Sequence, residues 1–125
     1  MRDEMAMNHA ECLKVDDLLE IVSRIAPPSP FNRCKATSRK LVTALRKRGT
    51  EAQVFRFSGH QRYRENVDPR WAKLPAWSWI HYAVYVPSLE VVLDPTWGQF
   101  ETKGSTFRIA SKDQYFAEWH EAGPA

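Results

Sequence analysis

The stretch His-Tyr-Ala-Val-Tyr-Val-Pro-Ser-Leu-Glu-Val-Val-Leu-Asp, residues 81–94, indicates how this chain folds. It consists of two runs of strand-forming residues on either side of Pro87-Ser88, a pair that favours a turn. A two-residue turn at this point gives an antiparallel hairpin in which His81 lies directly opposite Asp94. Cross-strand neighbours have Cβ atoms about 5 Å apart, which lets a carboxylate orient an imidazole.

A second pattern predicts a helix that begins with a cysteine. Apolar residues recur at helical spacing from about Arg33 to Arg48, and Gly49 supplies a C-terminal stop signal. Cys34 is therefore expected to be the first residue on the inward face of this helix. The predicted inward stripe consists of Cys34, Thr37 or Ser38, Leu41, Val42 and Leu45.

The rest of the chain completes the pattern of an α+β domain. A first helix is predicted over residues 15–26, and the prolines that follow it end the helix because proline cannot continue the hydrogen-bond ladder. The apolar residues that recur at helical spacing in it are Val15, Leu18, Leu19, Val22 and Ile25. After the second helix we expect a strand at 52–57, a loop from 58 to about 75, the hairpin at 78–94, and a short last helix that begins at Ser111 with Gln114 in a capping box.

Composition places the chain among ordinary globular proteins. Hydrophobic residues make up 43% and charged residues 26% of its 125 residues, so we expect a single domain over residues 1–125, with residues 1–14 as a candidate flexible tail. The net charge of +3 is too small to indicate nucleic-acid binding by itself. The two cysteines do not form a disulfide-rich framework.

No targeting or membrane segment is predicted. The N-terminal residues are polar and acidic and lack the apolar segment of a secretory signal. No apolar run approaches the roughly 20 residues that span a bilayer. We therefore expect a protein of the cytoplasm, or one delivered by a specialised secretion system, with no membrane contact.

Together, Cys34, His81 and Asp94 have the chemistry of a catalytic triad. A thiolate is the nucleophile, and a helix start and a nearby imidazole both lower a thiol pKa. The imidazole then serves as general base and acid, and the carboxylate fixes its tautomer. Each residue taken alone has a structural alternative: a small core residue, a strand histidine and a turn-forming aspartate before proline. The combination favours catalysis.

Three segments carry a family resemblance. Asn-Arg-Cys-Lys-Ala-Thr-Ser-Arg-Lys-Leu-Val, His-Tyr-Ala-Val-Tyr-Val and Val-Val-Leu-Asp-Pro-Thr-Trp-Gly-Gln-Phe resemble the core of papain-like and transglutaminase-like cysteine enzymes, over about residues 31–100. The chain looks most like compact bacterial papain-fold toxin or effector domains, several of which are glutamine deamidases. The resemblance implies N-terminal helices, with the catalytic Cys34 at a helix start, packed on a small antiparallel sheet. It also implies His81 as the base and acid and Asp94 as the orienting residue.

Further residues are weaker candidates for substrate or oxyanion binding. Asn32 is expected either to donate to an oxyanion or to cap the cysteine helix, and we favour the cap. Gln99 is expected to enter the cleft or to lie in a surface loop. The tryptophans near the hairpin are expected to wall a substrate groove or to pack in the core, which is their commoner use. These tryptophans are Trp77, Trp79 and Trp97.

The sequence thus predicts a cysteine-dependent amide hydrolase that works through a thioester on a protein or peptide substrate. Side-chain deamidation of glutamine fits the resemblance best, and a peptidase or a transglutaminase of the same fold remains open. The papain-type Cys-Gly-Ser-Cys-Trp surround is missing, which argues against a conventional peptidase. No metal or organic cofactor is expected. The rival hypotheses are a non-catalytic binding module that retains the fold and a nucleic-acid-binding protein that uses its basic helix, and the oligomeric state is left open.

Overall fold

A computed structural model of the chain describes residues 14–27, 32–60, 67–100 and 104–125. Most of the predicted N-terminal tail, with Cys12, lies outside these residues. The elements are, in chain order, α2 (Val15–Ile25), α3 (Cys34–Lys47), β1 (Gln53–His60), α4 (Pro69–Ala72), η1 (Ala76–Ser78), β2 (Ile80–Val86), β3 (Val91–Asp94), η2 (Trp97–Gln99), β4 (Arg108–Ser111), α5 (Lys112–Ala117) and β5 (Trp119–Pro124).

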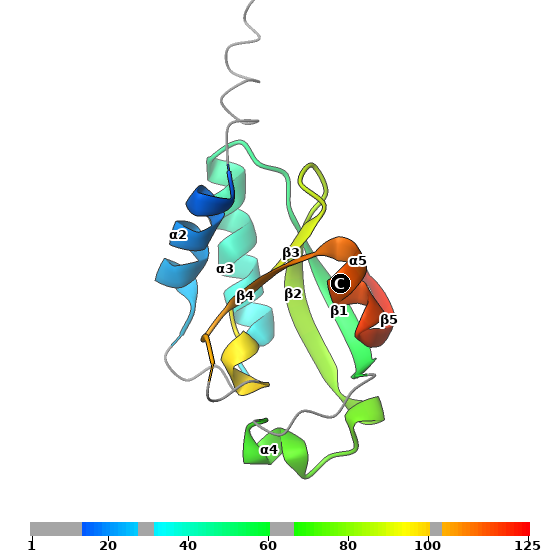
Figure 1. The fold of residues 1–125 in the computed structure, drawn as a ribbon. Coiled ribbons are helices and arrows are strands. Elements are labelled where there is room, and N and C mark those ends of the chain that lie inside the picture. Colours follow the sequence, from blue (N-terminus) through cyan, green and yellow to red (C-terminus); the bar gives the residue numbers. More distant parts are fainter. Residues whose placement is uncertain (1–13, 28–31, 61–66, 101–103) are drawn as a thin grey trace, which may run out of the picture.

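The strands form one open antiparallel sheet with the order β4-β3-β2-β1-β5. The first four strands follow one another as neighbours, and β5 returns to pair with the free side of β1. In Figure 1 the helices α2 and α3 lie side by side on one side of the sheet, whereas α5 lies by β5 and also contacts β4 and β3. The predicted α+β class, with N-terminal helices packed on an antiparallel sheet, is confirmed; β4 and β5 are strands that the sequence pattern did not indicate.

Each face of the sheet is buried in a different core. Alternate residues of a strand point to opposite faces, so β2 gives Val84 and Val86 to one core and Ala83 to the other. The first core is aliphatic and is completed by α2 and α3. The second core is mostly aromatic and consists of Phe57, Val67, Trp71, Trp79, Ala83, Val92, Trp97, Phe100, Ala110, Tyr115 and Trp119.

The predicted inward stripe of the cysteine helix is confirmed. The buried residues of α3 are Cys34, Thr37, Ser38, Leu41, Val42 and Leu45, with Gly49 just beyond the helix at φ 82°. In α2 the buried apolar residues are Leu18, Ile21 and Val22, whereas Leu19 is 39% exposed.

The predicted register of the hairpin is wrong by two residues. Val86 pairs with Val91 rather than with Leu89, and a four-residue turn replaces the two-residue one. Two-residue hairpin turns need a positive φ at the first central position, and proline fixes φ near −65°, so Pro87 cannot occupy that position. The chain instead places Glu90 in the left-handed region, with φ 51°.

The segment predicted as a loop from 58 to about 75 contains regular structure. Strand β1 continues to His60, and α4 follows at Pro69–Ala72 with Asp68 as its side-chain cap. Val67 and Trp71 are buried in the aromatic core. Residues 67–75 of this segment therefore contribute to the wall of the aromatic core, and residues 61–66 of the predicted loop lie outside the described residues.

Candidate active site

His81 and Asp94 form the buried centre of the site. The His81 Nε2 atom lies 2.7 Å from Asp94 Oδ2, and both side chains are fully buried. The observed register places Asp94 two positions along from the residue opposite His81. A shift by two residues keeps every side chain on its face of the sheet, so the pair still meets, as diagonal neighbours. The predicted contact therefore exists although the predicted direct pairing does not.

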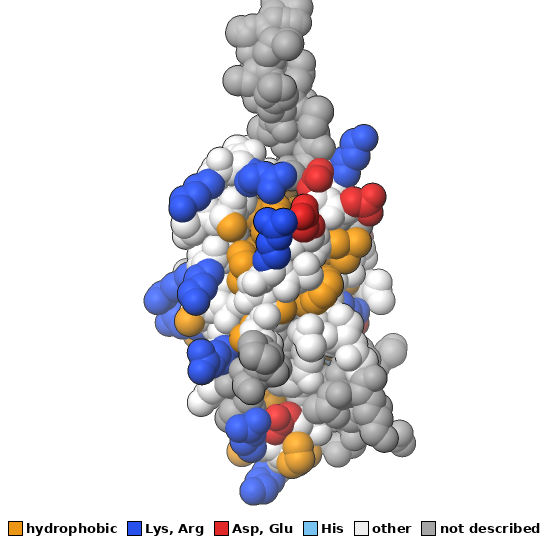
Figure 2. Space-filling view, turned by 90° about the vertical axis from the view of Figure 1, so that its left-hand side faces the viewer, with side chains coloured by type: hydrophobic (Ala, Val, Ile, Leu, Met, Phe, Trp, Pro, Cys, Tyr) orange, Lys and Arg blue, Asp and Glu red, His pale blue; other side chains and the backbone are white. Residues whose placement is uncertain are grey.

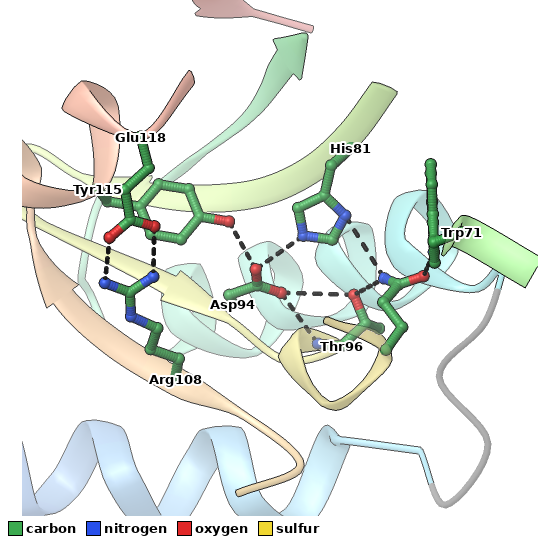
Figure 3. A network of polar contacts seen from close by, with 8 residues as sticks. Trp71, His81, Asp94, Thr96, Arg108, Tyr115 and Glu118 are labelled. Atoms are coloured by element: carbon green, nitrogen blue, oxygen red, sulfur yellow. Dashed lines mark hydrogen bonds and ion pairs between the residues drawn. The ribbon is translucent and has the colours of Figure 1, made fainter. Parts of the chain in front are cut away.

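Asp94 is held by further donors besides the imidazole (Figure 3). The Tyr115 hydroxyl donates to the same oxygen, Oδ2, at 2.5 Å. The other oxygen, Oδ1, accepts from the Thr96 backbone N–H at 3.1 Å and from the Thr96 hydroxyl at 3.4 Å. Hydrogen bonds to an ionised carboxylate are short and strong when the group is buried. These contacts fix the direction in which the carboxylate faces the ring.

Gln99 lies at the opposite edge of the imidazole. Its Oε1 accepts from the Trp71 indole N–H at 2.6 Å, and its Nε2 donates to the Thr96 hydroxyl at 3.1 Å. These two bonds fix the orientation of the amide, since Trp71 can only donate. The Nε2 atom lies 3.5 Å from His81 Nδ1. Gln99 is 1% exposed, so it belongs to the site and not to a surface loop.

Cys34 is the first residue of α3 and is 9% exposed. The hydrogen bond and charge of the His81 ring lower the pKa of its thiol. Because Asp94 occupies Nε2 of that ring, the nitrogen available to the thiol is Nδ1. The order carboxylate, imidazole, thiol is the order that a cysteine–histidine nucleophile requires.

A backbone hydrogen bond from Tyr82 also lowers the pKa of the thiol, and the sequence did not reveal it. Across β1 and β2, the Gly59 N–H donates to the Trp79 carbonyl at 2.8 Å, so the odd-numbered residues of β2 direct their backbone groups toward β1 and the even-numbered ones toward β3. Strand β3 ends at Asp94, and its pairing with β2 covers Val84 to Val86. The Tyr82 amide thus lies beyond the paired part of these two strands, where the start of α3 approaches.

The charges favour an ion pair between sulfur and imidazole. Burial raises the pKa of the Cys34 thiol, but the hydrogen bond and positive charge of His81, with the Tyr82 amide, more than offset it, so the thiol pKa lies below its ordinary value. Burial likewise lowers the pKa of His81, whereas Asp94 and Cys34 together raise it to about 10. The site therefore stabilises a thiolate beside an imidazolium.

Aromatic side chains enclose the imidazole. The His81 ring stacks on Trp119 at 5.7 Å and meets Phe100 edge-on at 4.7 Å. Trp79 and Trp97 are 1% and 5% exposed and pack in this aromatic core, whereas Trp77 is 72% exposed. Trp79 and Trp97 thus follow the core-packing alternative and do not wall an open groove.

A partly buried ion pair lies beside Tyr115. Arg108 donates from both terminal nitrogens to the two carboxylate oxygens of Glu118, each at 2.7 Å. The Arg108 guanidinium lies 4.5 Å from the Trp97 ring centre and 5.3 Å from that of Tyr115. Bidentate arginine pairs have a defined geometry, so this pair fixes the tyrosine that holds Asp94 (Figure 3).

The cap predicted at Asn32 is wrong. Arg33 occupies the N-cap position of α3, without a side-chain cap, and Asn32 precedes it at φ 63° with an exposed side chain. Asparagine tolerates this left-handed conformation better than most residues. Asn32 turns the chain into the helix, and its oxyanion role stays a prediction.

The contacts of Tyr115 and Thr96 with Asp94 could be predicted from the sequence only in part. The cap at Ser111, which accepts from the Gln114 N–H at 3.2 Å, correctly places Tyr115 on a short helix. Nothing in the pattern states that the hydroxyl reaches across to Asp94. Thr96 follows the Asp-Pro turn, where an aspartate commonly accepts from the backbone two residues later.

No family model, curated protein or solved structure matches the chain. Within residues 14–27, 32–60, 67–100 and 104–125, no cluster of three or more His, Cys, Asp or Glu side chains is placed to hold a metal ion. In the same ranges no helix has both the length and the apolar character needed to cross a membrane.

Proposed function

We propose that this protein is a cysteine-dependent amide hydrolase that works through a thioester on Cys34. The observation that carries the proposal is the buried His81, which meets the Asp94 carboxylate at 2.7 Å on one ring nitrogen and has the thiol as a partner. A histidine that served only to stabilise the fold would not require an ionisable thiol at the start of a neighbouring helix. That arrangement is the one that activates sulfur.

The geometry supports a two-step reaction. The Cys34 thiolate attacks the carbonyl carbon of the substrate amide, and the resulting oxyanion is stabilised by N–H groups at the start of α3, which have no intrahelical acceptor. His81 gives its proton to the nitrogen, ammonia or an amine leaves, and a thioester remains. His81 then takes a proton from water, which attacks the thioester; the acid is released and the thiolate and imidazolium are restored.

Gln99 and Tyr115 assist from opposite ends of the triad. The Gln99 amide is fixed with its donor toward the ring edge that serves the thiol, so we assign it to the stabilisation of the oxyanion. Tyr115 and Asp94 hold the imidazole in position. Trp79 and Trp97 contribute packing around these groups.

The substrate we propose is a glutamine side chain of a protein. This finer assignment, like that of a papain-like or transglutaminase-like core and of a toxin or effector role, rests on the resemblance of the three segments around Cys34, His81 and Asp94. The helix-start thiol next to an antiparallel sheet is consistent with it. A peptidase and a transglutaminase use the same thioester and differ in the bond attacked or in the acceptor.

The first test is the reactivity of Cys34 toward iodoacetamide. We expect rapid labelling of Cys34 at neutral pH and a much slower reaction of His81→Ala, because the imidazolium stabilises the thiolate. Cys12 in the same chain serves as an internal reference. Equal, slow labelling of both cysteines at neutral pH would refute the enzyme and favour a non-catalytic binding module.

The second test identifies the reaction. The protein is incubated with an N-protected glutaminyl-glycine dipeptide and a primary amine. Release of ammonia with formation of glutamate indicates deamidation, incorporation of the amine indicates transglutamination, and cleavage of the peptide bond indicates a peptidase. Cys34→Ala must abolish whichever product forms, otherwise that product does not come from this site.

A further inference from the structure

A groove of about 450 Å³ runs along one flank of α3. The helix contributes three basic side chains, Lys35, Arg39 and Arg46, and the floor includes Val54 of β1. Pro124, at the end of β5, lies on the far side. The groove therefore lies between the cysteine helix and the uncovered part of the sheet.

The charged side chains of α3 and of the residues at its two ends are all positive. Residues 33–48 contain no Asp or Glu, and their basic residues are Arg33, Lys35, Arg39, Lys40, Arg46, Lys47 and Arg48. Lys and Arg side chains outnumber acidic ones on the face that Figure 2 shows, which includes the side formed by α2 and α3. The pair between Arg46 and Glu51 spans 3.2 Å with both side chains more than half exposed, and such surface pairs are weak. The positive potential of the groove is therefore largely available to a partner.

One end of the groove lies next to the reactive thiol. Lys35 directly follows Cys34 in the chain, and its ammonium lies 5.3 Å from the centre of the Tyr82 ring. Tyr82 also lowers the pKa of the Cys34 thiol through its backbone. A polypeptide that lies in the groove thus approaches the thiol at the Lys35 end.

We propose that this groove binds an acidic segment of the polypeptide substrate and delivers an amide next to that segment to Cys34. The inference rests on the proposed function and adds the substrate class to it. From Lys35 to Arg46 the helix rises by about 16 Å. An extended peptide advances about 3.3 Å per residue, so the groove accommodates about five residues that carry Asp or Glu.

The lining of the groove favours a polypeptide over a nucleic acid. Single-stranded nucleic acids bind on aromatic side chains that stack with the bases. The described lining of this groove offers aliphatic and amide groups, such as Val42, Val54 and Gln53, and no aromatic ring. The reaction proposed for Cys34 also needs an amide as its target. An acidic protein surface meets both conditions.

The experiment compares two peptides of equal length. Each carries a chloroacetamide in place of a glutamine amide; glutamates flank it in one peptide and lysines in the other. We measure the rates at which each labels Cys34 in the full chain. We expect the glutamate peptide to react on the order of tenfold faster at low ionic strength and the advantage to shrink as salt is added.

Two charge reversals on the same helix provide the matched comparison. Arg39→Glu lies in the groove, whereas Lys40→Glu is its exposed neighbour on the other flank of α3. We expect Arg39→Glu to remove most of the preference for the glutamate peptide and Lys40→Glu to leave it nearly intact. Equal effects of the two variants, or no preference in the parent chain, would overturn the inference.

Iodoacetamide separates this inference from the proposed function. If this small neutral reagent labels Cys34 rapidly in the parent chain and in Arg39→Glu, the activated thiol is supported whatever the peptides show. If it labels Cys34 no faster than an ordinary thiol, the proposed function fails. A fluorescent oligothymidine is the last probe: tight binding that Arg39→Glu abolishes, without a preference between the peptides, would assign the groove to nucleic acid and overturn the inference.

Discussion

Asp94 shows how much structure a single buried charge requires. Moving an isolated carboxylate into a protein interior costs several kcal/mol, and the charge persists only where donors surround it. Here the donors are His81 of β2, Tyr115 of α5 and Thr96, which lies two residues beyond the end of β3. The site therefore holds together elements that are distant in the sequence.

Tyr115→Phe tests the weight of one of these donors. The change removes the hydroxyl that donates to Asp94 at 2.5 Å and keeps the ring in the aromatic core. Because hydrogen bonds to charged groups contribute about 1.5–3 kcal/mol, we expect the free energy of unfolding in urea to fall by that amount.

Tyr85→Phe is the matched control for this prediction. Its ring packs on Phe55 at 5.2 Å, and its hydroxyl has no hydrogen bond to any described residue. Such a change is expected to alter the stability by no more than about 0.5 kcal/mol. Equal losses in the two variants would show that the Asp94 contact does not contribute.

Asp94→Asn tests the electrostatic role of the same residue. Asp94 is the strongest group that raises the pKa of His81, so its neutral analogue should return the imidazole, and with it the thiol, toward ordinary values. An ordinary thiol is only a few per cent ionised at pH 7, so labelling of Cys34 by iodoacetamide at pH 7 should slow by up to about thirtyfold. Asp113→Asn, in the exposed first turn of α5, should leave the rate unchanged; a thiol that reacts equally fast in both variants contradicts the mechanism.

At the level of elements, the hairpin shows what periodicity can predict. Alternation assigns each residue of a strand to a face, and that assignment survives any shift by an even number of residues. The true register depends on the turn, where Pro87 excludes the two-residue form and Glu90 adopts φ 51°. His81 and Asp94 could therefore be predicted to share a face, but their diagonal arrangement could not.

Strands β4 and β5 were not predicted, and the reason is a different one. Strand β5 reads Trp-His-Glu-Ala-Gly-Pro, and most of these residue types are poor strand formers. It forms a strand because it pairs with the free edge of β1. This tertiary contact cannot be predicted from the local sequence pattern. By contrast, α3 could be predicted to within one residue at each end, although not its N-cap, since its period and its stop signal are local.

Gly59 lies near the end of β1 and gives a test at the same scale. Its φ is +69°, and a Cβ added there would lie 2.8 Å from His120 Cδ2 and 3.1 Å from the Trp77 carbonyl oxygen. Left-handed backbone costs an L-residue about 1–2 kcal/mol, and the carbonyl cannot easily retreat. We expect Gly59→Ala to lower the unfolding free energy by at least about 1 kcal/mol. At Gly123 an added Cβ meets nothing within 4 Å, so Gly123→Ala should cost clearly less, and equal losses would disprove the argument.

For the molecule as a whole, the site joins two cores. The aliphatic core with α2 and α3 carries the thiol on its helix, and the aromatic core carries the imidazole and the carboxylate. The sheet between them is only one strand layer thick, so the start of α3 can meet the start of β2. Contact between the thiol and His81 thus depends on the docking of both layers, and it couples the reactivity proposed for Cys34 to overall stability.

That coupling predicts the pH dependence of folding. His81 titrates near 6.5 when unfolded and near 10 when folded, so its contribution to stability is complete below pH 6.5 and is lost as the pH rises to 10. Cys34 has the opposite sign: its folded pKa is lowered from 9.0, so its contribution is present above pH 9.0 and is lost as the pH falls through the folded value. Where the folded thiol is ionised and the pH lies between 6.5 and 9.0, the pair binds one proton in both states, on the imidazole when folded and on the sulfur when unfolded.

In that pH range the two residues should therefore add no net slope to the stability of the parent chain. Cys34→Ala removes the compensating thiol but leaves Asp94 to hold the imidazolium, so the stability of this variant should fall as the pH rises from 6.5, by at most about 1.4 kcal/mol per pH unit. Urea unfolding of both chains across the range gives the difference, in which all other titrating groups cancel. A double variant, Cys34→Ala with His81→Asn, should lose the slope again. Parallel curves for the parent and Cys34→Ala would mean that the folded pair does not exist as thiolate and imidazolium.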